Sequence, residues 1–234
     1  MKWTVVFLLA AATLAAFCRP KPDSGFAVVE LFTSEGCSSC PPADHVLEQL
    51  DKQYPGKVLA MGFHVTYWDR LGWKDRFSDA AYTARQEDYA RLMALKTIYT
   101  PQAVVNGASE TVGSDKTRME ALVKTALLTP VTVGLEGQVD QDGLGHWTIH
   151  YQVDRPGLAV EAALVQRWAK TDVQGGENDG RQLDHINIVR ALGTGVANTI
   201  TLNYDIKPRD ARLFLWAQDT ATGHILKATE LQLH

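Results

Sequence analysis

The chain has 234 residues, of which 45% are hydrophobic and 21% are charged, and its net charge is −4 at pH 7. This composition is typical of a folded protein with one or two domains and differs from that of a disordered chain. The acidic balance does not supply the basic surface that nucleic acid binding requires, so we expect no nucleic-acid partner.

The first residues have the pattern of a secretory signal peptide. Lys2 is followed by an apolar run over residues 3–14 and then by two alanines. The run is too short to span a bilayer comfortably, so we interpret residues 1–18 as a signal peptide. Cys18 stands where a bacterial lipoprotein carries its lipid, although bulky Phe17 precedes it. We therefore expect a secreted or periplasmic protein, which is a membrane-attached lipoprotein only if Cys18 is lipidated.

The segment 25–129 alternates between strand and helix patterns. An apolar, β-branched run bounded by Gly25 predicts a buried strand over residues 26–32. Next come a helix with the apolar face Ala43, Val46, Leu47 and Leu50 and a strand over 58–65. A helix capped by Ser78 follows, with the apolar stripe Ala81, Ala84, Leu92 and Leu95, and then strands over 102–105 and 110–112. The last element is a helix capped by Ser114 with the apolar stripe Met119, Leu122, Val123 and Ala126. The predicted order is βαβαββα.

After Pro130 the apolar pattern changes from a helical period to an alternating one. Strands are predicted over residues 131–136, 147–153, 158–168, 186–190, 199–204, 213–217 and 226–233. Several short strands at this spacing predict a smaller antiparallel β-sandwich-like domain over residues 130–234.

Cys37-Ser38-Ser39-Cys40 stands at the predicted turn from the first strand into the first helix. A structural zinc site needs four ligands, but the chain has no second cysteine pair and its histidines are scattered. Attachment of c-type haem needs a histidine after the second cysteine, where Pro41 stands. Two explanations remain, namely dithiol–disulfide exchange and an inert disulfide, which would stabilise little because its loop is so small. For exchange, we expect Cys37 at the exposed helix start, where the helix dipole favours its thiolate, and Cys40, less exposed, as the resolving cysteine.

Thr100-Pro101 directly precedes the strand predicted over residues 102–105. In this element order we expect a cis peptide bond, which brings a backbone edge alongside the cysteines.

Together these motifs resemble the thioredoxin superfamily, in which C-x-x-C follows the first core strand and a cis-proline precedes the third. Residues 29–44, 64–69, 71–75 and 99–102 are also similar to a bacterial secreted family filed as domain of unknown function 1223. The resemblance implies an α/β fold, with a thioredoxin-like domain (βαβαββα, mixed sheet) over 25–129 followed by the β-rich domain over 130–234. It implies no established reaction. Ser38 and Ser39 replace the pair found in typical thioredoxins, so the direction of electron flow stays open.

The end of the second predicted strand should lie close to Cys37, because parallel strands end at the same edge of a sheet. His64 there could stabilise a thiolate or relay a proton. Tyr67 and Trp68 could form an apolar rim that recognises a peptide, or they could pack between domains. His185, in the second half, is interpreted as structural.

We therefore predict an exported thiol–disulfide oxidoreductase acting on protein thiols or disulfides, with no organic cofactor and no resident metal. The predicted catalytic residues are Cys37, Cys40 and Pro101, and the predicted substrate-binding residues are Thr100, His64, Tyr67 and Trp68. The alternative is a periplasmic copper-binding protein using both cysteines and His64, since thiolates and imidazole suit copper, or a protein-binding module on the same scaffold. The sequence gives no indication of the oligomeric state.

Overall fold

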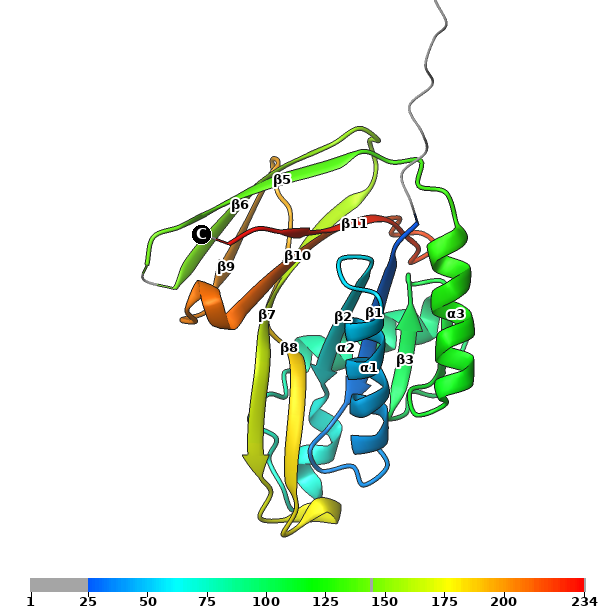
Figure 1. The fold of residues 1–234 in the computed structure, drawn as a ribbon, viewed down its shortest axis with the longest axis vertical. Helices are drawn as coiled ribbons and strands as arrows, with labels where there is room; N and C mark the ends of the chain where they lie inside the picture. The colour runs from blue at the N-terminus through cyan, green and yellow to red at the C-terminus, as the bar shows by residue number, and fades with distance from the viewer. Residues whose placement is uncertain (1–24, 144, 234) are drawn as a thin grey trace, which may run out of the picture.

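The structure, a computed structural model, describes residues 25–143 and 145–233. The signal peptide predicted over residues 1–18, with Cys18, lies outside these residues. The described chain forms a mixed α/β fold in which one large sheet runs through the molecule and a small sheet covers one end of it (Figure 1).

The first half of the described chain has the predicted order of elements. It contains β1 (Ala27–Thr33), α1 (Pro41–Gln53), β2 (Val58–His64), the 3-10 helix η1 (Thr66–Leu71), α2 (Ala80–Leu92), β3 (Gln102–Val105), β4 (Ser109–Val112) and α3 (Lys116–Leu128). β1 runs parallel to β2 and antiparallel to β3, which in turn pairs antiparallel with β4. The predicted helix caps are wrong by one residue. Asp79 accepts from the backbone N–H of Ala81, and Asp115 accepts from that of Arg118. An aspartate is favoured at these positions because its charge also complements the helix dipole.

The second half of the described chain contains strands and two short 3-10 helices. In order these are β5 (Leu135–Gln141), β6 (His146–Val153), β7 (Ala159–Asp172), η2 (Gly176–Asn178), β8 (Gln182–Thr194), β9 (Thr199–Asn203), η3 (Pro208–Asp210), β10 (Ala211–Gln218) and β11 (Ile225–Leu231). β7 and β8 are longer than predicted. They pair from Glu161↔Thr194 to Asp172↔Gln182 and form a long hairpin whose tip carries η2.

The large sheet crosses the predicted domain boundary at residues 129/130. Its strand order is β11-β10-β7-β8-β2-β1-β3-β4, and β8 joins β2 in parallel at Gly62↔Ile188. The small antiparallel sheet, β5-β6-β9, packs over β7, β10 and β11 with Trp147 and Ile149 in the shared core. This packing is sandwich-like, as predicted, but one of its two layers is continuous with the strands of the first half.

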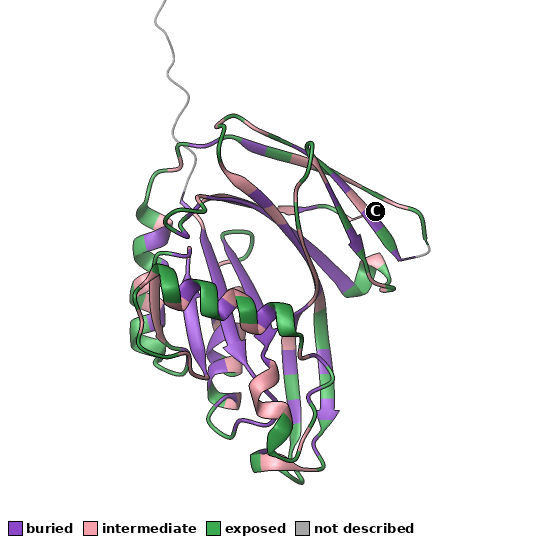
Figure 2. Cartoon of the chain, turned by 180° about the vertical axis from the view of Figure 1, so that it is seen from behind, coloured by how far each residue is buried: buried purple, intermediate pink, exposed green. Residues whose placement is uncertain are grey.

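Helices cover both faces of the strands in the first half. Along β1, alternate residues Ala27, Val29 and Leu31 pack with α1 and α3, whereas Val28 and Phe32 pack on the side of α2. Figure 2 shows the resulting pattern, with buried strands in the centre and helices whose outer faces are exposed.

α2 buries a different face from the predicted alanine and leucine stripe. Ala81, Ala84 and Leu92 are exposed, whereas the helix buries Tyr82, Gln86 and Tyr89. Two aromatic rings bury more apolar area than alanines, and their hydroxyl groups find partners. Tyr82 Oη donates to the carbonyl of Val189 at 3.0 Å, and Tyr89 Oη donates to Glu30 at 2.5 Å.

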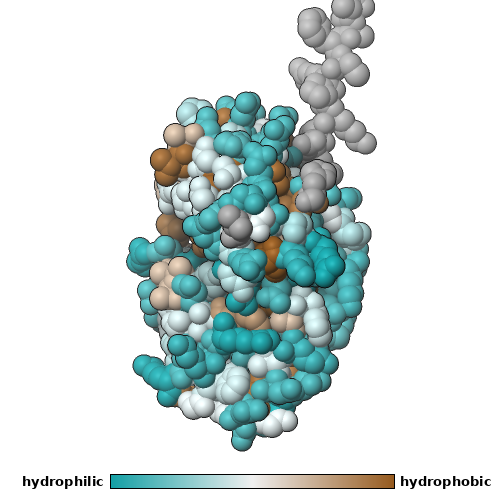
Figure 3. Space-filling view, turned by 90° about the vertical axis from the view of Figure 1, so that its left-hand side faces the viewer, coloured by the Kyte–Doolittle hydropathy of each residue, from teal (hydrophilic) through white to brown (hydrophobic). Residues whose placement is uncertain are grey.

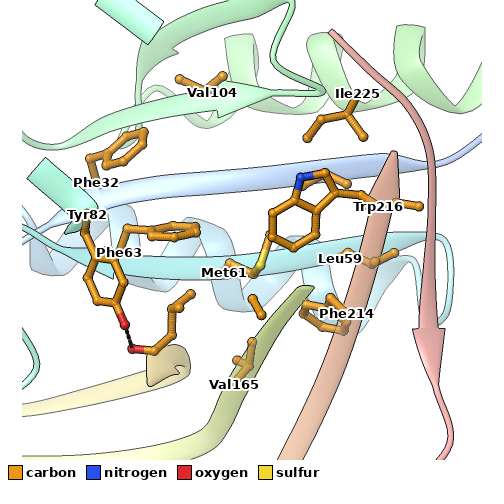
Figure 4. Close-up of a cluster of buried hydrophobic side chains, with 14 of the residues drawn as sticks. Phe32, Leu59, Met61, Phe63, Tyr82, Val104, Val165, Phe214, Trp216 and Ile225 are labelled. Atoms are coloured by element: carbon orange, nitrogen blue, oxygen red, sulfur yellow. Dashed lines mark hydrogen bonds between the residues drawn. The ribbon is translucent and has the colours of Figure 1, made fainter. Parts of the chain in front are cut away.

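The largest core is shared by both halves of the chain. Phe32 and Phe63 from the first half meet Phe214 and Trp216 from the second, and Trp216 is fully buried (Figure 4). Beside this cluster, Arg85 of α2 pairs with Glu30 of β1 and, at 2.9 Å, with Glu161 of β7. Buried apolar contacts and a buried ion-pair network therefore join the two halves.

The face seen in Figure 3 is largely hydrophilic, with small and separate apolar patches. Large apolar side chains that are exposed in the structure are Leu71, Leu92, Val112, Leu128, Trp168 and Val196. Within residues 25–143 and 145–233, no helix has the length and apolar character needed to cross a membrane.

Candidate active site

The cysteine motif lies in the loop between β1 and α1, as predicted. Cys37 and Cys40 form a disulfide whose Cα atoms are 5.4 Å apart. The backbone N–H of Cys40 donates to the carbonyl of Cys37 at 3.2 Å, and α1 begins directly afterwards with Pro41 and Pro42. The first turn of a helix tolerates prolines because its N–H groups have no partner within the helix. The loop therefore leads straight into the helix in spite of the two prolines.

Both sulfur-bearing residues are buried. Cys37 and Cys40 are each 0% exposed, while Ser38 and Ser39 between them are exposed. The expected exposure of Cys37 is therefore wrong. Sequence reasoning about the helix start alone could not include a cover that comes from the second half of the chain.

The cover is the tip of the β7–β8 hairpin, residues 175–181, which we call the cap. Asn178 is 0% exposed, and its Nδ2 donates at 2.9 Å both to the carbonyl of Glu35 and to that of Cys37. In Figure 1 the cap lies beside the β1–α1 loop at the bottom of the molecule. The backbone of the motif is thus bound by a side chain that is 141 residues away from Cys37 in the sequence.

Glu177 reaches the motif from the same cap. Its Oε2 accepts from the backbone N–H of Ser38 at 3.0 Å and from Ser38 Oγ at 2.7 Å. These two hydrogen bonds, first the backbone one, lower the pKa of Glu177. A carboxylate is therefore held at Ser38, the residue that follows Cys37 in the chain.

The close fit of the cap depends on glycine. Gly176 has a φ of +69°, and a Cβ there would lie 3.2 Å from Trp73 Cβ and 3.7 Å from Gly36 Cα. A Cβ on Gly175 would lie 2.4 Å from the carbonyl oxygen of Gly72. The backbone of the cap consequently approaches the loop more closely than larger residues would allow.

His64 is not on an accessible rim. It ends β2 opposite Thr33 of β1, and its side chain is 1% exposed. Its Nδ1 lies 2.6 Å from Asp75 Oδ2, which also accepts from the backbone N–H of Glu35 at 2.8 Å. Burial raises the pKa of Asp75, but His64 and these hydrogen bonds outweigh it, so the pKa is lowered. His64 is held as one half of a buried pair near the motif.

His185 of β8, interpreted as structural from the sequence, was not expected to lie beside the motif. Its Nε2 lies 3.3 Å from Glu35 Oε1, its Nδ1 lies 3.8 Å from Asp44 Oδ2, and its ring centre is 5.1 Å from that of His64. Burial disfavours the imidazolium, but Asp44 and Glu35 outweigh burial and raise the pKa of His185 to about 9. Burial likewise opposes ionisation of Glu35, but hydrogen bonds from His185 and two further side chains together outweigh it, and the pKa of Glu35 is lowered. At neutral pH a charged His185 thus lies between two carboxylates.

Trp68 and Thr100 lie together, as two predicted substrate-binding residues would. Trp68 Nε1 donates to Thr100 Oγ1 at 2.7 Å, and a Cβ on Gly36 would lie 3.5 Å from Trp68 Cβ. Tyr67 instead turns toward α2, where its Oη donates to Gln86 Oε1 at 3.3 Å. Burial raises the pKa of Tyr67 to about 12. Trp68 and Thr100, both half-buried, are therefore the nearer candidates for a contact surface.

Pro101 lies beside Gly113, which also neighbours the first turn of α1. The Thr100–Pro101 peptide bond is cis, as predicted. A Cβ on Gly113 would lie 3.1 Å from Ala43 Cβ and 3.5 Å from Pro101 Cβ, so Pro101 and Ala43 flank the same glycine. Ala43 is three residues after Cys40. The start of β3 therefore approaches the helix that follows the motif.

Within the part of the chain that the structure describes, no group of three or more His, Cys, Asp and Glu side chains is arranged to hold a metal ion. The predicted copper ligands illustrate the reason, since the two cysteines are joined to each other and His64 Nδ1 faces Asp75. No observation favours the copper alternative over exchange.

The fold and the site define a mixed α/β protein with a capped disulfide at the start of a helix. Residues 28–218 match the family model described as protein of unknown function (DUF1223), and the chain belongs to this family. No curated protein matches it.

Two solved structures are similar over most of the chain. A crystal structure of a protein from Agrobacterium tumefaciens has a TM-score of 0.67 and 27% identity, covering 90% of this chain and 96% of that one. HBP35 of Porphyromonas gingivalis has a TM-score of 0.60 and 16% identity, covering 91% of this chain and 77% of that one. At this lower identity the likeness concerns the fold alone.

Proposed function

We propose that this protein is an exported thiol–disulfide oxidoreductase with a thioredoxin-like fold. The observation that carries the proposal is the Cys37–Cys40 disulfide in the loop from β1 into α1. Support also comes from the strand order β2-β1-β3-β4 and from Pro101, which directly precedes β3 and approaches α1. In the thioredoxin superfamily, which the sequence resembles, the C-x-x-C pair follows the first core strand and the cis-proline precedes the third in the same way.

The proposed reaction transfers two electrons between the dithiol and a protein disulfide. In the reducing direction, the Cys37 thiolate attacks one sulfur of a substrate disulfide, forms a mixed disulfide and releases the other substrate sulfur as a thiolate. Cys40 then loses its proton to water and attacks Cys37 Sγ. The Cys37–Cys40 bond forms, the mixed disulfide breaks, and the second substrate thiolate leaves. In the oxidising direction, a substrate dithiol runs the same steps in reverse.

One contact in the structure suits the first step. Ser39 Oγ lies 3.3 Å from Cys37 Sγ. A hydroxyl group at this place can donate to a thiolate once the disulfide is reduced, because hydrogen bonds to an ionised acceptor are among the stronger ones.

A trapping experiment tests the proposal. We expect the reduced Cys40→Ala variant, mixed with a short peptide dimer joined by one disulfide, to gain the mass of one peptide chain and to release the other as a thiol. The matched Cys37→Ala variant keeps only the resolving cysteine and should gain much less. Wild-type protein should also accelerate reduction of the same dimer by dithiothreitol. The proposal is wrong if the Cys40→Ala variant forms no mixed disulfide and the wild type does not accelerate the reduction.

A further inference from the structure

Glu177 is an exposed residue with a specific contact to the cysteine motif. Its carboxylate accepts both the backbone N–H and the hydroxyl of Ser38, which directly follows Cys37 in the chain. Two donors of the four-residue motif are therefore engaged by a negative charge. While Glu177 holds them, they do not donate to a sulfur.

The contact is fixed by the residues on either side of Glu177. Asn178 is fully buried and donates to the Cys37 carbonyl, and Gly176 packs closely on Trp73 and Gly36. The backbone around Glu177 is thus attached to the β1–α1 loop at two further places. Its carboxylate lies beside Ser38 because the whole cap is built against the motif.

Within the described residues Glu177 makes no ion pair, because Arg181, the cation of the same cap, instead donates to Asn178 Oδ1 at 2.7 Å. In the part of the chain that the structure describes, the hydrogen-bond partner of Glu177 is the neutral Ser38. Nearby, Glu35 and Asp44 lie against the charged His185, and Asp75 lies against His64. Glu177 therefore adds a net negative charge on the exposed side of the disulfide.

We propose that Glu177 sets the redox equilibrium of the Cys37–Cys40 pair. A carboxylate next to the motif disfavours the Cys37 thiolate through like-charge repulsion. Because the thiolate exists only in the reduced protein, this repulsion shifts the equilibrium toward the disulfide and makes the dithiol a stronger reductant. Glu177 takes no part in the bond exchange itself. It acts on Cys37 through its charge and is therefore a positioning residue, not a catalytic one. The biological meaning of the inference rests on the proposed function, but the equilibrium is a property of the protein itself.

The test measures the exchange of the protein disulfide with glutathione. In this reaction the disulfide and two glutathione thiols give the protein dithiol and one glutathione disulfide. Glu177→Gln removes the charge, and its amide oxygen can still accept from Ser38. We expect the equilibrium constant to shift about two- to tenfold toward the dithiol, and the pKa of the Cys37 thiol, followed by its alkylation rate against pH, to fall by about a few tenths to one unit.

Asp179→Asn is the matched control. It removes the same charge two residues further along the cap, where the side chain is exposed. We expect its equilibrium constant to stay within about a factor of two of the wild type, because solvent and salt screen an exposed charge that has no fixed contact with the motif.

The salt dependence of the glutathione exchange equilibrium is a second measurement. Raising the ionic strength screens an exposed carboxylate, so the wild-type equilibrium should move toward the dithiol, and the Glu177→Gln equilibrium should move less. Equal shifts in Glu177→Gln and Asp179→Asn, or an unchanged thiol pKa in Glu177→Gln, would overturn the inference. These readouts use glutathione alone, so they stand apart from the peptide-trapping result on which the proposed function depends.

Discussion

Buried titratable side chains beside the disulfide lie in close contact with one another. His64 faces Asp75, and His185 lies between Glu35 and Asp44. Removing one member of such a contact leaves its partner buried and uncompensated, which is costlier than removing both. Removal of His185 should lower the stability of the fold most, because the side chain lies between two carboxylates.

The pKa of His185 leads to a pH-dependent stability. It is raised in the folded protein from 6.5 to about 9, so the charged imidazole stabilises the fold fully below pH 6.5, and this contribution is lost as the pH rises through about 9. We expect the oxidised His185→Gln variant to be less stable than the wild type by about 2–3 kcal/mol at pH 6, and the gap to shrink toward pH 9. Urea unfolding of both proteins at several pH values measures this difference in unfolding free energy.

His224→Gln is the control, because His224 is exposed on the β10–β11 turn. It should leave the unfolding free energy almost unchanged across the same range. A His185→Gln gap that stays constant from pH 6 to pH 9 would mean that the charge of His185 does not stabilise the fold.

At this scale the sequence predicted the position of the cysteine motif and a disulfide within it, but not the surroundings of the cysteines. The C-x-x-C spacing and the position after an apolar strand are local signals, and both lead to the disulfide. By contrast, Asn178 and His185 reach the motif only because β8 joins the large sheet. Their sequence context, a polar loop and an ordinary strand, contains no signal of that contact.

Among the elements, the β7–β8 hairpin matters most for the site. Its outer part extends beyond the small sheet and delivers the cap to the β1–α1 loop (Figure 1). Since Cys37 is 0% exposed under this cap, a reagent can reach its sulfur only after local opening. The hydrogen bonds of Asn178 oppose that opening.

Asn178→Ala should therefore make the disulfide easier to reach. It removes the two hydrogen bonds to the carbonyls of Glu35 and Cys37, and also the one that Asn178 Oδ1 accepts from Arg181 within the cap. A loss of about 1–2 kcal/mol in cap closure would raise the rate of reduction by dithiothreitol roughly five- to thirtyfold. Asp179→Ala, on the same cap, should react at the wild-type rate. If the two variants reduce at the same rate, the side-chain amide of Asn178 does not hold the cap closed.

Element order was predictable, since each strand and helix of the first half carries its own apolar period. The lengths of β7 and β8, by contrast, were not predictable from the sequence. Arg167 and Trp168 are both exposed and break the alternation midway along β7, although it resumes from Trp168 to Asp172, where β7 pairs with β8. The buried face of α2 was missed for a related reason, because Tyr82 and Tyr89 are buried with hydroxyl partners from β8 and β1.

In the whole molecule, the two halves share a sheet and a core. Phe214 and Trp216 pack with Phe32 and Phe63, and Arg85 connects β1 to β7. Burying an aromatic side chain removes a large apolar area from water, and the second half supplies much of the cover for β2. The boundary at residues 129/130 is therefore a point in the sequence across which many buried contacts run.

A fragment of residues 25–129 should consequently not fold on its own. Without the second half, the apolar face formed by Leu59, Met61 and Phe63 would lose its contacts with Val165, Phe214 and Trp216. We expect the fragment to lack the dispersed amide NMR spectrum of a folded protein, and the full chain to unfold in a single urea transition. A well-folded fragment would show that the first half is an independent domain.

The cap also imposes an order of events on the growing chain. Asn178 follows Cys37 by 141 residues, so a chain made from its N-terminus presents both cysteines long before their cover exists. Until β7 and β8 dock, the thiols are open to any oxidant they meet, and afterwards they are enclosed. We therefore expect the redox state of the pair at the moment when the cap first closes to depend on whether oxidation or completion of the fold comes first.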